Sequence, residues 1–104
     1  MWAKFIDEWR QTRAVIQGVQ SIIQGAQHHY LKILPEYYLA IEDGTKTFEV
    51  RFNDRNYQVG DVLYLREFVP PETYTGRELR REVSYVLDDP AYCKEGFVVL
   101  GLKM

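Results

Sequence analysis

The sequence has little of several residue types, and each scarcity excludes a class of protein. Its 104 residues include one cysteine, Cys93, so neither an intramolecular disulfide nor a zinc site built from several cysteines can form. The net charge of −2 and the pI of 5.7 weigh against the basic surface of an extended duplex binder. No apolar run approaches the ~20 residues that a membrane helix needs, and the charged N-terminus lacks the apolar stretch of a signal peptide. We therefore expect a cytoplasmic protein without a membrane partner.

The two parts of the chain differ in composition. Residues 1–27 contain no proline, whereas residues 28–104 contain all four prolines and all eight tyrosines. With 46% apolar and 14% aromatic residues, the chain has enough apolar surface for one core, and its length leaves no room for a second. We predict one domain over residues 28–104, preceded by a separate segment over residues 1–27.

The N-terminal segment has apolar residues at helical spacing. They recur at every seventh position, at Trp2, Trp9, Ile16 and Ile23. This spacing predicts a long amphipathic helix over residues 2–24. Its apolar stripe favours burial, and three alternatives are open: the helix docks on its own domain, it pairs with a second copy in a homodimer through residues 2–26, or the segment is a fraying tail.

The pattern over residues 28–104 is typical of short β-strands with one helix near the start. Turn residues and apolar alternation predict strands over 30–34, 46–52, 62–68, 77–87 and 97–102, and a helix over 35–43. Pro35 suits the first turn of that helix, and Gly44 suits its end. The order β-α-β-β-β-β with mostly antiparallel neighbours predicts a small closed or half-closed barrel, α+β in class and mainly β.

Two of these strands have informative patterns. Strand 46–52 alternates strictly, which places Phe48, Val50 and Phe52 on one face and Thr47, Glu49 and Arg51 on the other. The unbroken apolar run at 97–102 predicts a strand that is buried on both faces.

Seven short motifs along the domain carry a resemblance to a known family. They are HYLKILPEYY at 29–38, GTKTFEVR at 44–51, NDR at 53–55, VGDVL at 59–63, LRE at 65–67, YTGR at 74–77 and GFVVLG at 96–101. In this order and spacing they resemble a family of short bacterial and phage proteins of uncharacterised function. That family is itself similar to the ASCH domains of the PUA-like superfamily.

The resemblance implies a PUA-like β-pseudo-barrel with one short helix after the first strand and a cleft between barrel and helix. It also implies binding of RNA or a modified nucleotide. One ASCH branch removes the acetyl group from acetylated cytidine with a lysine, a threonine three residues on and a distant glutamate. Lys46 matches that lysine, but Glu49 stands at the threonine position, and this departure speaks against the same hydrolysis.

The charged residues of strand 46–52 suit a polar ligand. Arg51 can hold a phosphate or carboxylate through two hydrogen bonds, and Lys46 supplies a compact positive charge. Glu49 can accept hydrogen bonds from an exocyclic amine of a base. The alternative is that Glu49 and Arg51 form a simple exposed ion pair, worth less than about 1 kcal/mol. The full set of predicted ligand-binding residues is Lys46, Thr47, Glu49, Arg51, Arg55, Arg66 and His29.

Metal ions and cofactors have no recognisable site in the sequence. Adjacent His28 and His29 cannot both face one metal from a strand, and there is no phosphate-binding loop or dinucleotide fingerprint. We therefore expect neither a metal nor a cofactor.

Three functions remain. The first is a non-enzymatic module that binds RNA or a modified nucleotide. The second is a small hydrolase acting on a modified base, with Lys46 as the catalytic amine and Glu49 or Glu67 as the acid–base group. The third is an interaction module that uses the N-terminal helix.

Overall fold

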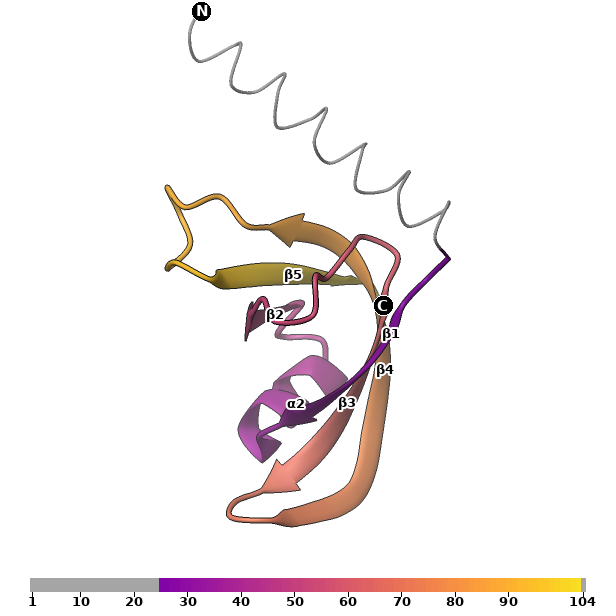
Figure 1. The fold of residues 1–104 in the computed structure, drawn as a ribbon. Coiled ribbons are helices and arrows are strands. Elements are labelled where there is room, and N and C mark those ends of the chain that lie inside the picture. The colour runs from indigo at the N-terminus through magenta and orange to yellow at the C-terminus, as the bar shows by residue number, and fades with distance from the viewer. Residues whose placement is uncertain (1–24, 104) are drawn as a thin grey trace, which may run out of the picture.

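The computed structural model describes residues 25–103. The elements are β1 (His28–Ile33), α2 (Pro35–Glu42), β2 (Phe48–Phe52), β3 (Val62–Val69), β4 (Thr73–Leu87) and β5 (Phe97–Lys103) (Figure 1). The helix predicted over residues 2–24, and the dimer contact predicted through residues 2–26, lie outside the described residues, apart from the last two of that contact.

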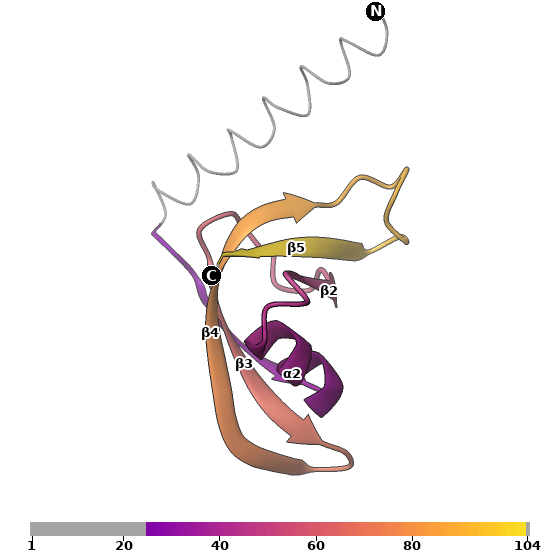
Figure 2. The ribbon, with the colours of Figure 1, turned by 180° about the vertical axis from the view of Figure 1, so that it is seen from behind.

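The five strands form one sheet in the order β1-β3-β4-β5-β2. The β1–β3 pair is parallel and the other three pairs are antiparallel. The long strand β4 pairs with β3 over its first part and with β5 over its second, and its register shifts between Val83 and Tyr85. The sheet curls along β4 into a half-barrel, and α2 sits in its hollow, as the opposite views of Figures 1 and 2 show.

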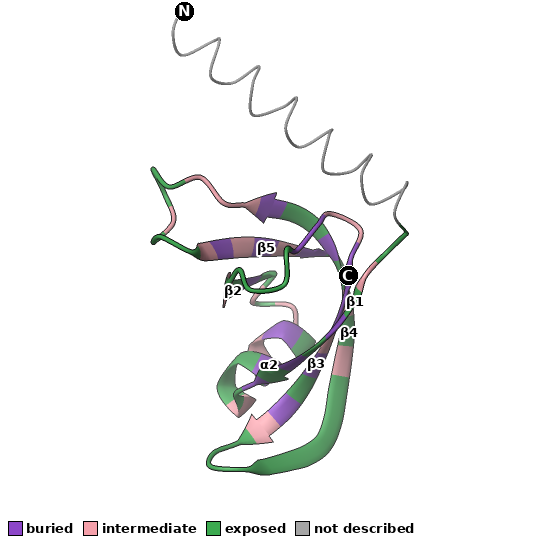
Figure 3. Cartoon of the chain, in the orientation of Figure 1, coloured by how far each residue is buried: buried purple, intermediate pink, exposed green. Residues whose placement is uncertain are grey.

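The core lies between the concave side of the sheet and α2. Because strand side chains alternate, every second residue points into this hollow. The core residues that the strands and α2 contribute are Leu31 and Ile33 of β1, Tyr38 and Ile41 of α2, Leu63 and Leu65 of β3, Val83 and Val86 of β4, and Val98, Leu100 and Leu102 of β5 (Figure 3), and Tyr57 of the loop before β3 joins them. Pro35 starts α2 directly after β1, and Gly44, with φ at +86°, follows its last turn. The helix therefore folds back at once under the sheet.

The α+β class predicted from the sequence is wrong for the residues that the structure describes. The described residues form a mainly β half-barrel with a single helix of 8 residues, and no long amphipathic helix belongs to that part of the chain. The sheet is half-closed, because β1 and β2 occupy its two edges and are not paired with each other. Alternation predicts strands one by one, but whether the first and last strands of a sheet meet depends on its curvature.

A second expectation, that the strand at 97–102 is buried on both faces, is also wrong. Strand β5 is buried on one face only, since Val98, Leu100 and Leu102 are buried whereas Phe97 and Val99 are half-buried. On β2, the apolar residues Phe48, Val50 and Phe52 are exposed and Glu49 points inward. Strand β2 thus directs its polar face into the half-barrel, where it shapes a site.

Candidate ligand-binding cleft

A cleft of about 510 Å³ opens between the end of β1, the start of α2 and strand β2. Its lining comprises Lys32, Ile33, Leu34, Tyr37, Lys46, Phe48, Glu49, Val50 and Arg51. The tight turn from β1 into α2 brings Tyr37 of the first helical turn opposite the polar face of β2. The cleft therefore lies between the sheet and the helix.

Glu49 is the buried polar group of the cleft, with only 4% of its surface exposed. Its Oε1 accepts a hydrogen bond of 2.6 Å from Lys46 Nζ, and its Oε2 accepts one of 2.9 Å from Arg51 Nε. A buried carboxylate is tolerated when it is paired and hydrogen-bonded, and here each oxygen has a cation. The simple exposed ion pair considered from the sequence is therefore wrong, because the carboxylate is buried and shared by two cations.

The guanidinium of Arg51 also reaches across the open seam between β2 and β1. Its Nη2 donates a hydrogen bond of 2.7 Å to the backbone carbonyl of Lys32. Its Nη1 has no hydrogen-bond partner among residues 25–103. Arg51 thus joins the edge strands through its side chain, and its Nη1 group is not engaged within the described residues.

Lys46 is held by aromatic rings as well as by Glu49. Its ammonium lies 4.9 Å from the ring centroid of Tyr37 and 5.3 Å from that of Phe48. Such cation–π contacts are worth about 0.5–1 kcal/mol at exposed sites. They fix the amine at the wall of the cleft.

The structure brings together three of the predicted site residues, Lys46, Glu49 and Arg51, and places the rest elsewhere. Thr47 is exposed, and its carbonyl accepts a hydrogen bond of 2.9 Å from the amide of Leu102, outside the cleft lining. Arg66 lies outside the cleft too, bonded to Glu78 at 3.0 Å. Arg55 lies in the turn after β2, exposed, with its Nε 3.9 Å from Asp54.

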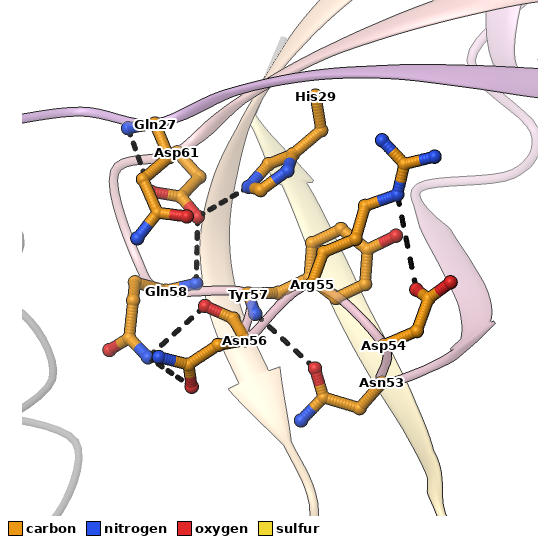
Figure 4. Close-up of polar contacts among 9 residues, drawn as sticks. All are labelled: Gln27, His29, Asn53, Asp54, Arg55, Asn56, Tyr57, Gln58 and Asp61. Carbon is orange, nitrogen blue, oxygen red and sulfur yellow. Dashed lines mark hydrogen bonds and ion pairs between the residues drawn. The ribbon is translucent and has the colours of Figure 1, made fainter.

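His29 belongs to a separate buried polar cluster around Asp61 (Figure 4). Asp61 is fully buried, and its Oδ2 lies 2.9 Å from His29 Nε2. Its carboxylate also accepts hydrogen bonds from the backbone amides of Gln58 at 2.9 Å and Gln27 at 3.2 Å. The ring of Tyr57 packs edge-on against His29, with centroids 4.9 Å apart. Asp61 ties the entry of β1 to the loop before β3, a role that the VGD turn alone did not reveal.

Glu67, the second candidate acid–base group, is also engaged elsewhere. It is 3% exposed, and Arg77 donates to both of its oxygens, at 2.6 and 3.0 Å, while Thr75 donates at 2.7 Å. The hydrogen bonds from Arg77, and then that from Thr75, lower the pKa of Glu67 below its usual value. The guanidinium of Arg77 in turn packs over the ring of Tyr38 at 4.5 Å. These contacts tie Glu67 to β4 and α2, and it does not line the cleft.

Within residues 25–103 there is no cluster of three or more potential metal ligands. The same part of the chain contains no helix that is long and apolar enough to cross a membrane.

The described residues thus define a small half-barrel domain with a cationic cleft between sheet and helix. The family model described as a domain of unknown function, DUF3850, matches residues 28–102, and the chain belongs to this family. The chain is also similar to an uncharacterised 12.9 kDa protein encoded in the GpA 3′ region of Escherichia phage P2, with 36% identity over 63 residues. That alignment covers 61% of this chain and 57% of the phage protein, so it spans little more than half of the relative.

Proposed function

We propose that the domain binds RNA or a modified nucleotide, with the base seated in the cleft between β2 and α2. The observation that carries this proposal is the buried carboxylate of Glu49, which is flanked by Lys46 and Arg51 in a cleft that the rings of Tyr37 and Phe48 also line. Sites for small molecules commonly measure about 300–1,000 Å³ and combine apolar walls with a few fixed polar groups. The cleft has this size and this construction.

The chemistry of each wall fits a nucleobase. A carboxylate accepts hydrogen bonds from an exocyclic amine, as Glu49 would from cytosine or adenine. The ring of Tyr37 is 44% exposed and offers a surface on which a base can stack. The remaining donors of Lys46 and Arg51 suit the carbonyl oxygens of a base or an anionic group.

We also propose that the family is related to the ASCH and PUA-like domains. The ordered motifs support this relationship, and so does a curled sheet whose first strand leads directly into a short helix. RNA or modified-nucleotide binding is the function that this relationship would carry to the chain.

The hydrolase alternative draws on one contact, the 2.6 Å between Lys46 Nζ and Glu49 Oε1, which joins an amine to a carboxylate in the cleft. Incubation of the chain with acetylated cytidine, followed by an assay for released acetate, tests this alternative. Release of acetate that is lost in the Lys46→Met variant would establish hydrolysis, and binding without release would leave the domain a binding module.

Isothermal titration of the full chain with ribonucleosides, modified ribonucleosides and short single strands tests the proposal. We expect binding that the Glu49→Gln and Tyr37→Ala variants weaken at least tenfold. The matched control is Glu36→Gln on the first turn of α2, which removes an exposed carboxylate outside the cleft and should leave binding unchanged. Equal affinity in the Glu49→Gln and Glu36→Gln variants would refute the role of the cleft.

A further inference from the structure

A second hollow, of about 380 Å³, adjoins the cleft along the seam between the edge strands. Both hollows share Lys32 and Arg51 in their linings, and these two residues form the hydrogen bond across the seam. The second hollow is also lined by Arg55 of the turn after β2 and by the rings of Tyr30 and Tyr74.

This second hollow carries an excess of positive charge in a chain of net charge −2. It has three cationic side chains, and its single carboxylate, Asp54, is exposed and lies 3.9 Å from Arg55 Nε. Lys32 makes no hydrogen bond or ion pair from its ammonium to any residue within 25–103, and lies 4.5 Å from the ring centroid of Phe68. The Nη1 of Arg51 likewise has no hydrogen-bond partner among residues 25–103. These cations are available to an anion from outside.

The aromatic walls of the second hollow are exposed but held in place. Tyr30 and Tyr74 are each 50% exposed. The ring of Tyr30 stacks on that of Tyr64 with centroids 4.6 Å apart and planes at 12°, and the guanidinium of Arg66 lies 4.6 Å from it. Tyr74 packs edge-on against Phe68. The hollow therefore combines aromatic walls that are held in place with three cationic side chains.

We infer that the second hollow is a phosphate subsite, so that the ligand of the cleft is a nucleotide or a single strand rather than a free nucleoside. The inference rests on the proposed function. The base occupies the cleft at Glu49, and its phosphate lies across the seam against Lys32, Arg51 and Arg55. Phosphate oxygens are suited to this set, because guanidinium groups bind them through paired hydrogen bonds and an ammonium adds a point charge.

Titration of the full chain with each ribonucleoside, its 5′-monophosphate, a four-nucleotide single strand of the same base and inorganic phosphate tests the inference. We expect the monophosphate to bind at least tenfold more tightly than the nucleoside. The Arg55→Gln variant should lose most of that gain, and Arg55→Lys should retain part of it. The matched control is Arg80→Gln, since Arg80 is exposed on β4 and lines neither hollow.

The different ligands and variants distinguish a failure of the phosphate subsite from a failure of the cleft proposal. Nucleosides that bind as tightly as their monophosphates, or an Arg55→Gln variant that binds monophosphates normally, would overturn the phosphate subsite and leave the cleft proposal standing. Absence of binding by every nucleoside, nucleotide and strand would overturn both. A single strand that binds more tightly than the monophosphate identifies a polymer as the source of the phosphate, whereas equal affinities identify a free nucleotide.

Discussion

The Nη2 of Arg51 donates a hydrogen bond of 2.7 Å to the backbone carbonyl of Lys32, and so links two strands that share no backbone pairing. An open half-barrel leaves the backbone groups of its edge strands unpaired, and such edges are prone to other contacts. Here one side chain bridges the seam and anchors itself on the buried Glu49. The bridge holds the cleft and the second hollow in a fixed relation to each other.

Replacing Arg51 by alanine should lower the stability of the domain. The change removes a hydrogen bond to the Lys32 carbonyl and leaves the buried carboxylate of Glu49 with one cation instead of two. Hydrogen bonds that involve a charged group contribute about 1.5–3 kcal/mol, so we expect a loss of that order in the free energy of unfolding. Urea denaturation measures it, with Arg80→Ala as the matched control. Equal midpoints for the two variants would show that the bridge does not stabilise the seam.

Asp61 should be among the least replaceable residues of the domain. The Asp61→Ala change would leave two backbone amides and the ring nitrogen of His29 without their acceptor in a buried position. Each buried group left unpaired costs about 1–3 kcal/mol, and we expect a total loss of about 3 kcal/mol or more. Thermal unfolding followed by circular dichroism checks this against Asp54→Ala, an exposed carboxylate expected to cost less than about 0.5 kcal/mol. Similar melting temperatures for the two variants would contradict the assigned role of Asp61.

The strands themselves were predictable because alternation and turn residues are local signals. All five predicted strands are present, with ends that differ by a few residues. The largest difference is at β4, which begins at Thr73 rather than at residue 77 because the polar segment before Arg77 continues the pairing with β3. The convergence of Lys46, Glu49 and Arg51 was predictable for the same reason, since they lie on or next to one strand.

The parts that sequence reasoning missed depend on contacts between distant residues. His29 and Asp61 are separated by 32 positions, and Arg51 and Lys32 by 19. No periodicity in a single sequence specifies which of several polar residues will meet across a curved sheet. The open edge and the exposed apolar face of β2 also follow from the curvature of β4, a property of the assembled sheet.

Acid should destabilise the domain partly through Glu67. The pKa of Glu67 is lowered in the folded chain, chiefly because Arg77 donates hydrogen bonds to its carboxylate and secondarily because Thr75 does. A carboxyl group of this kind stabilises the fold above its unfolded-state pKa, near 4.5, and loses that contribution as the pH falls through the folded-state pKa. We therefore expect the urea midpoint to fall as the pH drops below about 5.

The Glu67→Gln variant has no carboxyl group to titrate, so its urea midpoint should depend less on pH over the same range. Thr75→Val removes one donor and keeps Arg77, and should give an intermediate slope. If the urea midpoint of the Glu67→Gln variant fell with pH as steeply as that of the parent chain, other carboxylates would account for the acid sensitivity.

Binding of single strands should depend on salt, and only weakly. Each phosphate neutralised on a single strand contributes a slope of roughly 0.7 to the fall of log affinity with log salt, so one phosphate held by Lys32, Arg51 and Arg55 predicts a slope of about 0.7. Arg51→Ala should reduce both affinity and slope, whereas Arg80→Ala should change neither, because Arg80 is exposed on β4 and lines neither hollow. Fluorescence anisotropy between about 50 and 200 mM salt measures the slope. A slope near ten, or tight binding of a duplex, would require an extended basic face, which these three cations do not provide.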